Sequence, residues 1–176
     1  MYLTTIIVIY VVNYRQYVAP FPNFGVLAAN IRTFGKFNAI GIQEEAQYES
    51  LGGEFSDMKS WVLSKLLWNP NLDTDSLVNQ FITDYYGPAA THIRQYFDLC
   101  HSLIKDETVM GIYINDRNPL FTIEFIADAD KLLKLAKEAV SNCVEDVRLR
   151  VDMVAMQNEM EAAAPEHISP DRKSIN

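Results

Sequence analysis

The first part of the chain places short apolar runs between polar connections, in an order typical of a strand-helix-strand unit. Leu3–Val12 is dominated by β-branched residues and predicts a strand that is buried on both faces. Asn23 is a good N-cap for a helix over Phe24–Phe34, which Gly35 closes. Ala39–Gln43 then predicts a second buried strand. This order implies two parallel strands joined by a right-handed crossover.

The next part of the chain has apolar residues at helical spacing. A helix over residues 55–67 is expected to end before Pro70, and Asp73 or Thr74 can cap the helix that follows. Gly87 fits a left-handed C-terminal position, and Pro88 opens a third helix. The expected inward residues are Phe55, Met58, Val62, Leu63, Leu66 and Leu67, then Leu77, Val78, Phe81, Ile82, Tyr85 and Tyr86, then Ile93, Tyr96, Phe97, Cys100, Leu103 and Ile104.

The last part predicts a helical hairpin. One helix carries apolar residues from Leu132 to Val140, and another carries them from Val144 to Met156. Met110–Ile114, before the hairpin, reads equally as a short strand or a packed loop. Residues 162–176 are expected to fray or be disordered. The expected fold is therefore α/β, with about two parallel strands followed by a mainly helical region.

Composition and charge narrow the range of partners. A chain of 176 residues with 49% hydrophobic content is long enough to bury one sizeable core. The net charge of −8 disfavours nucleic acid and anionic membranes as partners, because both require an excess of Lys and Arg. Leu3–Val12 lacks the basic flank of a signal peptide and is shorter than the ~20 residues of a membrane helix. Neutral or polar ligands fit this chain better.

The residues that commonly bind metals give no pattern here. Cys100 and Cys143 are far apart in helical patterns, which indicates two buried free thiols. His92, His101 and His167 do not match a metal-ligand spacing. No metal or other cofactor is expected.

The candidate chemistry lies where the second strand ends, at Gln43, Glu44 and Glu45. Ligand-handling side chains gather at the C-terminal ends of parallel strands. The two carboxylates are adjacent, so on an extended segment they point to opposite sides and cannot form an acid/base pair. Glu44, Glu45, Glu49 and Glu54 can also be read as solvated loop charges or as anions at a helix N-terminus.

Other residues suit carbohydrate as a ligand. Asn13 and Tyr14 follow the first strand in a segment of amide, aromatic and guanidinium groups that suits sugar hydroxyls and sugar faces, and equally suits an ordinary loop. Trp61 and Trp68 could stack on sugars, but their place in an amphipathic helix favours core packing.

Four segments together resemble a known family. They are Pro20–Asn23, Gly41–Glu44, Trp61–Pro70 and Phe81–Ala90. The set resembles a bacterial domain-of-unknown-function family with a TIM-barrel body related to alpha-glucuronidases and other glycoside hydrolases. The resemblance covers about residues 10–156.

The resemblance implies that residues 1–53 form the last strand-helix-strand unit of a (β/α)₈ barrel, residues 54–161 a helical C-terminal region, and residues 162–176 a tail. A whole barrel takes ~250 residues, so earlier strands and their catalytic groups would lie outside this chain. The implied function is that of a fragment, inactive alone, of a periplasmic or extracellular glycoside hydrolase-like protein. Glu44 and Glu45 are then the catalytic candidates, and Asn13, Tyr14 and Gln43 the substrate-binding candidates.

Two other functions stay open on the sequence. One is a noncatalytic carbohydrate-binding module, and the other is a helical interaction domain. In the barrel interpretation, exposed strand edges should also make the chain self-associate.

Overall fold

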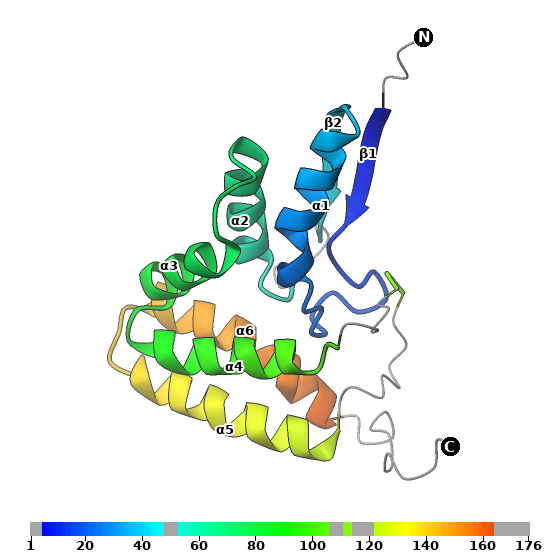
Figure 1. The fold of residues 1–176 in the computed structure, drawn as a ribbon. Coiled ribbons are helices and arrows are strands. Elements are labelled where there is room, and N and C mark those ends of the chain that lie inside the picture. The colour runs from blue at the N-terminus through cyan, green and yellow to red at the C-terminus, as the bar shows by residue number, and fades with distance from the viewer. Residues whose placement is uncertain (1–4, 48–52, 106–110, 114–121, 164–176) are drawn as a thin grey trace.

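The protein is a mixed α/β structure in which most of the regular structure is helical. The computed structural model describes residues 5–47, 53–105, 111–113 and 122–163 (Figure 1). In chain order the elements are β1 (Thr5–Tyr10), α1 (Phe24–Lys36), β2 (Ala39–Glu45), α2 (Ser56–Trp68), α3 (Thr74–Tyr86), the 3₁₀ turn η1 (Gly87–Ala89), α4 (Ala90–Ser102), α5 (Ile123–Ala139) and α6 (Glu145–Ala163).

The two strands are parallel, as the sequence predicts. Tyr10 lies opposite Glu45, Ile9 opposite Glu44 and Ile7 opposite Ile42. The pairing continues past the predicted end of β2, because the Val11 amide donates to the Glu45 carbonyl at 3.0 Å. Both glutamates therefore belong to the strand.

Helix α1 packs against β2, α2 stands beside α1 on the side away from the strands, and α3 to α6 form a body below them (Figure 1). In this body α4 lies beside α5, and α5 beside α6 (Figure 1), which confirms the helical hairpin. The core includes Leu27 and Ile31 of α1 together with residues of every later α-helix. The arrowhead of β1 points toward the helical body, so the strand ends and the helices meet in the loops that follow the strands.

A buried ion pair fixes this meeting point. Lys59 of α2 is 1% exposed and pairs with Glu54, which is 2% exposed. The same ammonium donates to the Val11 carbonyl at 3.1 Å and to the Phe21 carbonyl at 3.0 Å. Lys59 thus joins the end of β1, the turn before α1 and the start of α2. The alternative that Glu54 is a solvated charge is wrong.

The end of α1 differs from the expectation. Gly35 lies inside the last turn, because the Phe37 amide still bonds to the carbonyls of Thr33 and Phe34. The residue that adopts the left-handed conformation is Asn38, with φ 56°. Asn23 occupies the N-cap position, but its side chain makes no capping hydrogen bond.

The later helix boundaries agree with the sequence more closely. Asp73 caps α3 by accepting from the Ser76 amide at 2.8 Å. Gly87 has φ 52°, and Pro88 lies in the turn that leads into α4. Of Met110–Ile114, only residues 111–113 are described, and they form no strand; residues 164–176 of the expected tail lie outside the described part.

Several predictions of burial need correction. The first strand is not buried on both faces, because Ile6 is 66% and Val8 44% exposed, and Leu67 of α2 is 42% exposed. Trp68 is 91% exposed, because it lies two positions past the buried Leu66 and so points to the other side of α2. Trp61 is half-buried and packs on Phe81, with ring centroids 5.7 Å apart. Both thiols are free, but only Cys100 is buried, whereas Cys143 is partly exposed.

Candidate functional site

The candidate site lies on the open face of the sheet, at the carboxyl ends of the strands. Side chains alternate between the two faces of a strand. Ile9 and Ile42 point to the covered face and pack against the core. On the other face Ile6 is 66%, Val8 44% and Tyr10 40% exposed. By register, that open face also carries Gln43 and Glu45.

Glu45 is held by two neighbours on this face. The Tyr14 hydroxyl donates to Glu45 Oε2 at 3.1 Å, and Gln43 Nε2 donates to Glu45 Oε1 at 3.1 Å. Gln43 and Glu45 are two apart on the strand and so share a face, while Tyr14 reaches them from the loop after β1. Because both carboxylate oxygens accept a hydrogen bond, the orientation of Glu45 is fixed. We call Tyr10, Tyr14, Gln43 and Glu45 the rim.

Tyrosine rings surround the phenol that reaches Glu45. The Tyr14 ring lies 5.6 Å from that of Tyr10, 5.8 Å from that of Tyr17 and 6.1 Å from that of Tyr113. Burial and the hydrogen bond to Glu45 raise the pKa of Tyr14 to about 12. Tyr14 is therefore a neutral hydrogen-bond donor at physiological pH.

The loop that carries Tyr14 is fixed by its backbone. The Tyr14 amide donates to the Ile112 carbonyl at 2.7 Å. Asn13 is 2% exposed, and its side-chain oxygen accepts from the Arg15 amide at 3.1 Å. This bond is an Asx turn, which sets the direction of the chain after β1. The structure therefore places Asn13 inside the loop beside the rim, and the role of Asn13 in binding substrate stays a prediction.

Glu44 points to the opposite face from Glu45. It lies opposite Ile9, on the covered side of the sheet, and its carboxyl oxygens are buried without a hydrogen-bond partner in the described part of the chain. Burial raises the pKa of Glu44 to about 7. The adjacent carboxylates thus have different environments, and they do not face one substrate together.

The rim can bind more readily than it can catalyse. Glu45 is the single carboxylate that the described strand residues place on the open face. Glycoside hydrolysis usually requires two, held ~5 to ~9.5 Å apart. Oriented carboxylate and amide groups beside tyrosine rings suit sugar hydroxyls and apolar sugar faces.

Within the described residues, no three His, Cys, Asp or Glu side chains are arranged to hold a metal ion. None of the described helices is long and apolar enough to cross a membrane.

Sequence reasoning missed two residues that shape the site. Tyr10 is the last residue of β1 and lies opposite Glu45, a position that the strand pattern could have shown. Lys59 lies four residues before Leu63 and seven before Leu66, on the buried stripe of α2. A lysine on such a stripe is a signal for a buried partner, which here is Glu54.

Comparison with known proteins agrees with the domain-of-unknown-function part of the sequence resemblance. No curated protein and no solved structure matches the chain. One family model does match, over residues 3–98, from the start of the chain into α4. These residues include both strands and the whole rim, and they make up more than half of the chain. The chain belongs to the family of the domain of unknown function DUF4838.

Proposed function

We propose that this chain supplies one side of a carbohydrate-binding site in a glycoside hydrolase-like protein. The observation that carries the proposal is Glu45, held by Tyr14 and Gln43 on the open face at the carboxyl end of a parallel sheet. Such a carboxylate can accept hydrogen bonds from sugar hydroxyls, and the neighbouring Tyr10 ring offers an apolar surface to a sugar ring. Glu45 is the rim residue that we propose contacts the substrate.

The exposure of apolar side chains on the open face is an argument that these strands belong to a larger sheet. Parallel sheets are normally covered on both faces, yet Ile6, Val8 and Tyr10 are exposed here. In a (β/α)₈ barrel the covered face would meet the outer helices, and the open face would point into the barrel. Ile6 and Val8 would then fill the barrel interior. Tyr10, Gln43 and Glu45 would lie at its C-terminal end, where the active sites of such barrels are found.

In this arrangement the chain holds one carboxylate of the reaction at most. Glu44 is on the helix-facing side, so we propose Glu45 as the group near the scissile bond and expect its partner to come from another part of the protein. Glu44 is then a residue of the sheet-helix interface.

A noncatalytic carbohydrate-binding role is the second candidate. It is favoured by the same finding, that the described strand residues place one carboxylate on the open face. Both candidates use the same rim. They differ in whether the protein that contains this chain cleaves the glycan that it binds.

Binding of the purified chain to an array of neutral oligosaccharides tests the shared claim. We expect selective binding that is lost in Glu45→Gln and kept in Glu138→Gln, a control at an exposed carboxylate of α5. No binding by the unaltered chain, or equal binding by the Glu45→Gln variant, would remove the proposal. Release of shorter sugars from a bound oligosaccharide would separate the hydrolase from the noncatalytic module.

A further inference from the structure

A pocket lies between α1, α3 and α4, and none of the rim residues lines it in the described structure. Its volume is about 450 Å³. Small-molecule sites typically occupy ~300 to ~1,000 Å³, so this pocket is large enough for a small organic ligand. We call it the α1–α3–α4 pocket.

The floor of the pocket is apolar. Phe24 is 2%, Ala28 5%, Val78 1% and Phe97 5% exposed, and all four line the cavity. The Phe24 and Phe97 rings meet edge to face with centroids 5.1 Å apart. The floor therefore suits an aliphatic or aromatic group of a ligand.

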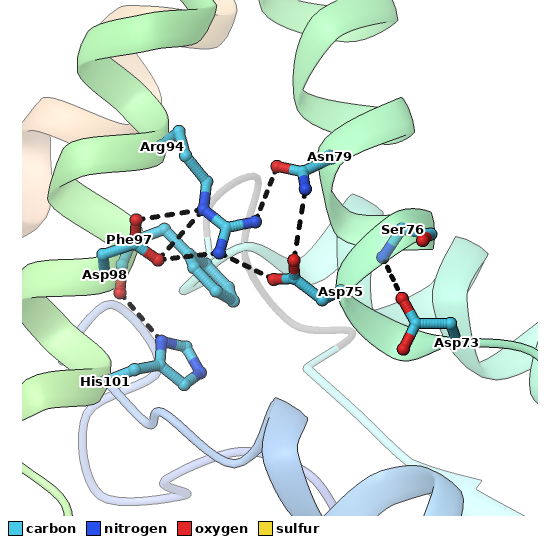
Figure 2. A network of polar contacts seen from close by, with 8 residues as sticks. All are labelled: Asp73, Asp75, Ser76, Asn79, Arg94, Phe97, Asp98 and His101. Carbon is cyan, nitrogen blue, oxygen red and sulfur yellow. Dashed lines mark hydrogen bonds and ion pairs between the residues drawn. The ribbon is translucent and has the colours of Figure 1, made fainter.

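The guanidinium of Arg94 does not serve as an anion receptor. Figure 2 shows it between Asp98 of α4 and Asp75 of α3. Its Nε donates to Asp98 at 2.9 and 3.1 Å, its Nη2 to Asp75 at 2.6 Å, and its Nη1 to Asn79 at 2.6 Å. These groups use most of the donor capacity of Arg94, and two carboxylates neutralise its charge.

His101 also lines the pocket. Its Nδ1 lies 2.8 Å from the Phe97 carbonyl (Figure 2), which can only accept, so Nδ1 carries the hydrogen. Burial lowers the pKa of His101, which favours the neutral ring. The other nitrogen, Nε2, then presents a lone pair, and it is buried without a hydrogen-bond partner in the described part of the chain. Its burial keeps it out of reach of a ligand in the pocket, so His101 contributes an uncharged ring to the lining.

The charge balance of the lining favours a cation. Three carboxylates, from Asp73, Asp75 and Asp98, stand against two guanidinium groups, from Arg32 and Arg94. Asp73 is exposed, and one of its oxygens caps α3. Arg32 donates to the Pro70 carbonyl at 2.9 Å. The lining therefore carries one more negative than positive charge.

We propose that the α1–α3–α4 pocket binds a small organic amine, with its apolar body on the Phe24 and Phe97 floor and its ammonium group near the carboxylates of Asp73, Asp75 and Asp98. The described residues include no set of three suitably placed metal ligands, so an organic cation fits this wall better than a metal ion.

Three probes of matched size test the chemistry by ligand-observed NMR. Phenethylamine carries an apolar ring and an ammonium group, phenethyl alcohol keeps the ring with a neutral donor, and hydrocinnamate reverses the charge. Saturable binding in the order amine, alcohol, carboxylate supports the proposal. Tighter binding of the alcohol or the carboxylate overturns it, as does the absence of saturable binding by the amine.

A substitution that fills the pocket locates the binding. Gly25 lines the cavity, and a Cβ added there would have nothing within 4 Å, so Gly25→Leu should fold and occupy the space. Gly35→Leu is the matched control. Gly35 lies in the same helix, a Cβ added there also has nothing within 4 Å, and Gly35 does not line the pocket. Loss of amine binding in the first variant alone is expected. Equal binding by both variants contradicts the assignment.

A second substitution tests whether the negative charge of Asp73 contributes to amine binding, and it preserves the cap of α3. Asp73→Asn keeps an N-cap of equal quality and removes one carboxylate. Amine affinity should fall about two- to fivefold, as expected for one exposed charge pair, while affinity for the alcohol stays constant. Asp84→Asn, at an exposed site elsewhere on α3, should change neither affinity. An unchanged amine affinity in Asp73→Asn would contradict the electrostatic part of the proposal.

Discussion

Lys59 and Glu54 form an ion pair in the protein interior, with side chains 1% and 2% exposed. Burial lowers the pKa of Lys59, while the Glu54 charge opposes that shift. The lysine also bonds the Val11 and Phe21 carbonyls, so one ammonium group joins three segments of the chain. Removing it leaves a buried carboxylate and two carbonyls without their donor.

We expect Lys59→Met to lower the free energy of unfolding by about 3 to 5 kcal/mol, the range for breaking one side of a buried ion pair. Urea denaturation followed by circular dichroism measures the change. Lys65→Met, at an exposed lysine of the same helix, should stay within about 0.5 kcal/mol of the unaltered chain. A loss below about 1 kcal/mol for Lys59→Met would show that the pair contributes little.

Glu44 should make stability depend on pH. Burial raises its pKa from 4.5 to about 7, so the folded state binds the proton more tightly than the unfolded state does. The contribution of protonated Glu44 to the free energy of unfolding is therefore complete below about pH 4.5 and is lost as the pH rises toward 7. Glu44→Gln mimics the protonated form and should stabilise the chain at pH 8 by roughly 1 to 2 kcal/mol, a value reduced for solvent screening.

Urea titrations of both proteins between pH 5 and pH 8 measure this effect. Glu138→Gln, at an exposed carboxylate, is the control, and its curve should follow that of the unaltered chain. If Glu44→Gln is no more stable than the unaltered chain at pH 8, the Glu44 carboxyl does not have the buried environment described here.

The two thiols should differ in reactivity. Cys100 is buried, and that burial raises the pKa of its thiol, whereas Cys143 is partly exposed. A thiol-disulfide reagent should therefore modify Cys143 in the folded chain and Cys100 only after denaturation. Counting modified thiols by mass spectrometry in Cys143→Ser checks this. Rapid modification of Cys100 in that folded variant would disagree with the packing around α4.

The open face should make the isolated chain self-associate. Neither strand has a second neighbouring strand in the described part of the chain, and Ile6 and Val8 are exposed. Val8→Lys should shift elution in size-exclusion chromatography toward the monomer. Val144→Lys, at an exposed valine just before α6, should not. A monomer at all concentrations of the unaltered chain would count against the larger sheet that we propose.

The positions of the helices and strands were predicted well, because these elements follow from the local periodicity of apolar residues. Short apolar runs identified both strands but not their exposed face, and the apolar stripes, together with Asp73, Gly87 and Pro88, identified the helices and several of their boundaries. The end of α1 was missed, because hydrogen bonding continued past Gly35. The exposure of Trp68 was missed, because it depends on which side of α2 the neighbouring helices cover.

The site could be predicted only in part. Strand alternation showed that Glu44 and Glu45 point to opposite sides, but not which side would be covered. The contact between Tyr14 and Glu45 joins residues 31 positions apart, and the bond from Lys59 to Val11 joins residues 48 apart. Contacts of this kind depend on the packing of whole elements and leave no local pattern in the sequence.

The most direct test of the proposed site compares the two adjacent glutamates on one ligand. The affinity of Glu45→Gln and Glu44→Gln for the neutral oligosaccharide with the strongest array signal can be measured by isothermal titration calorimetry. We predict a loss of about tenfold or more for Glu45→Gln, as for a lost hydrogen bond to a charged group, and no change for Glu44→Gln. A loss in Glu44→Gln with Glu45→Gln unaffected would contradict the assignment of the open face as the ligand-binding side.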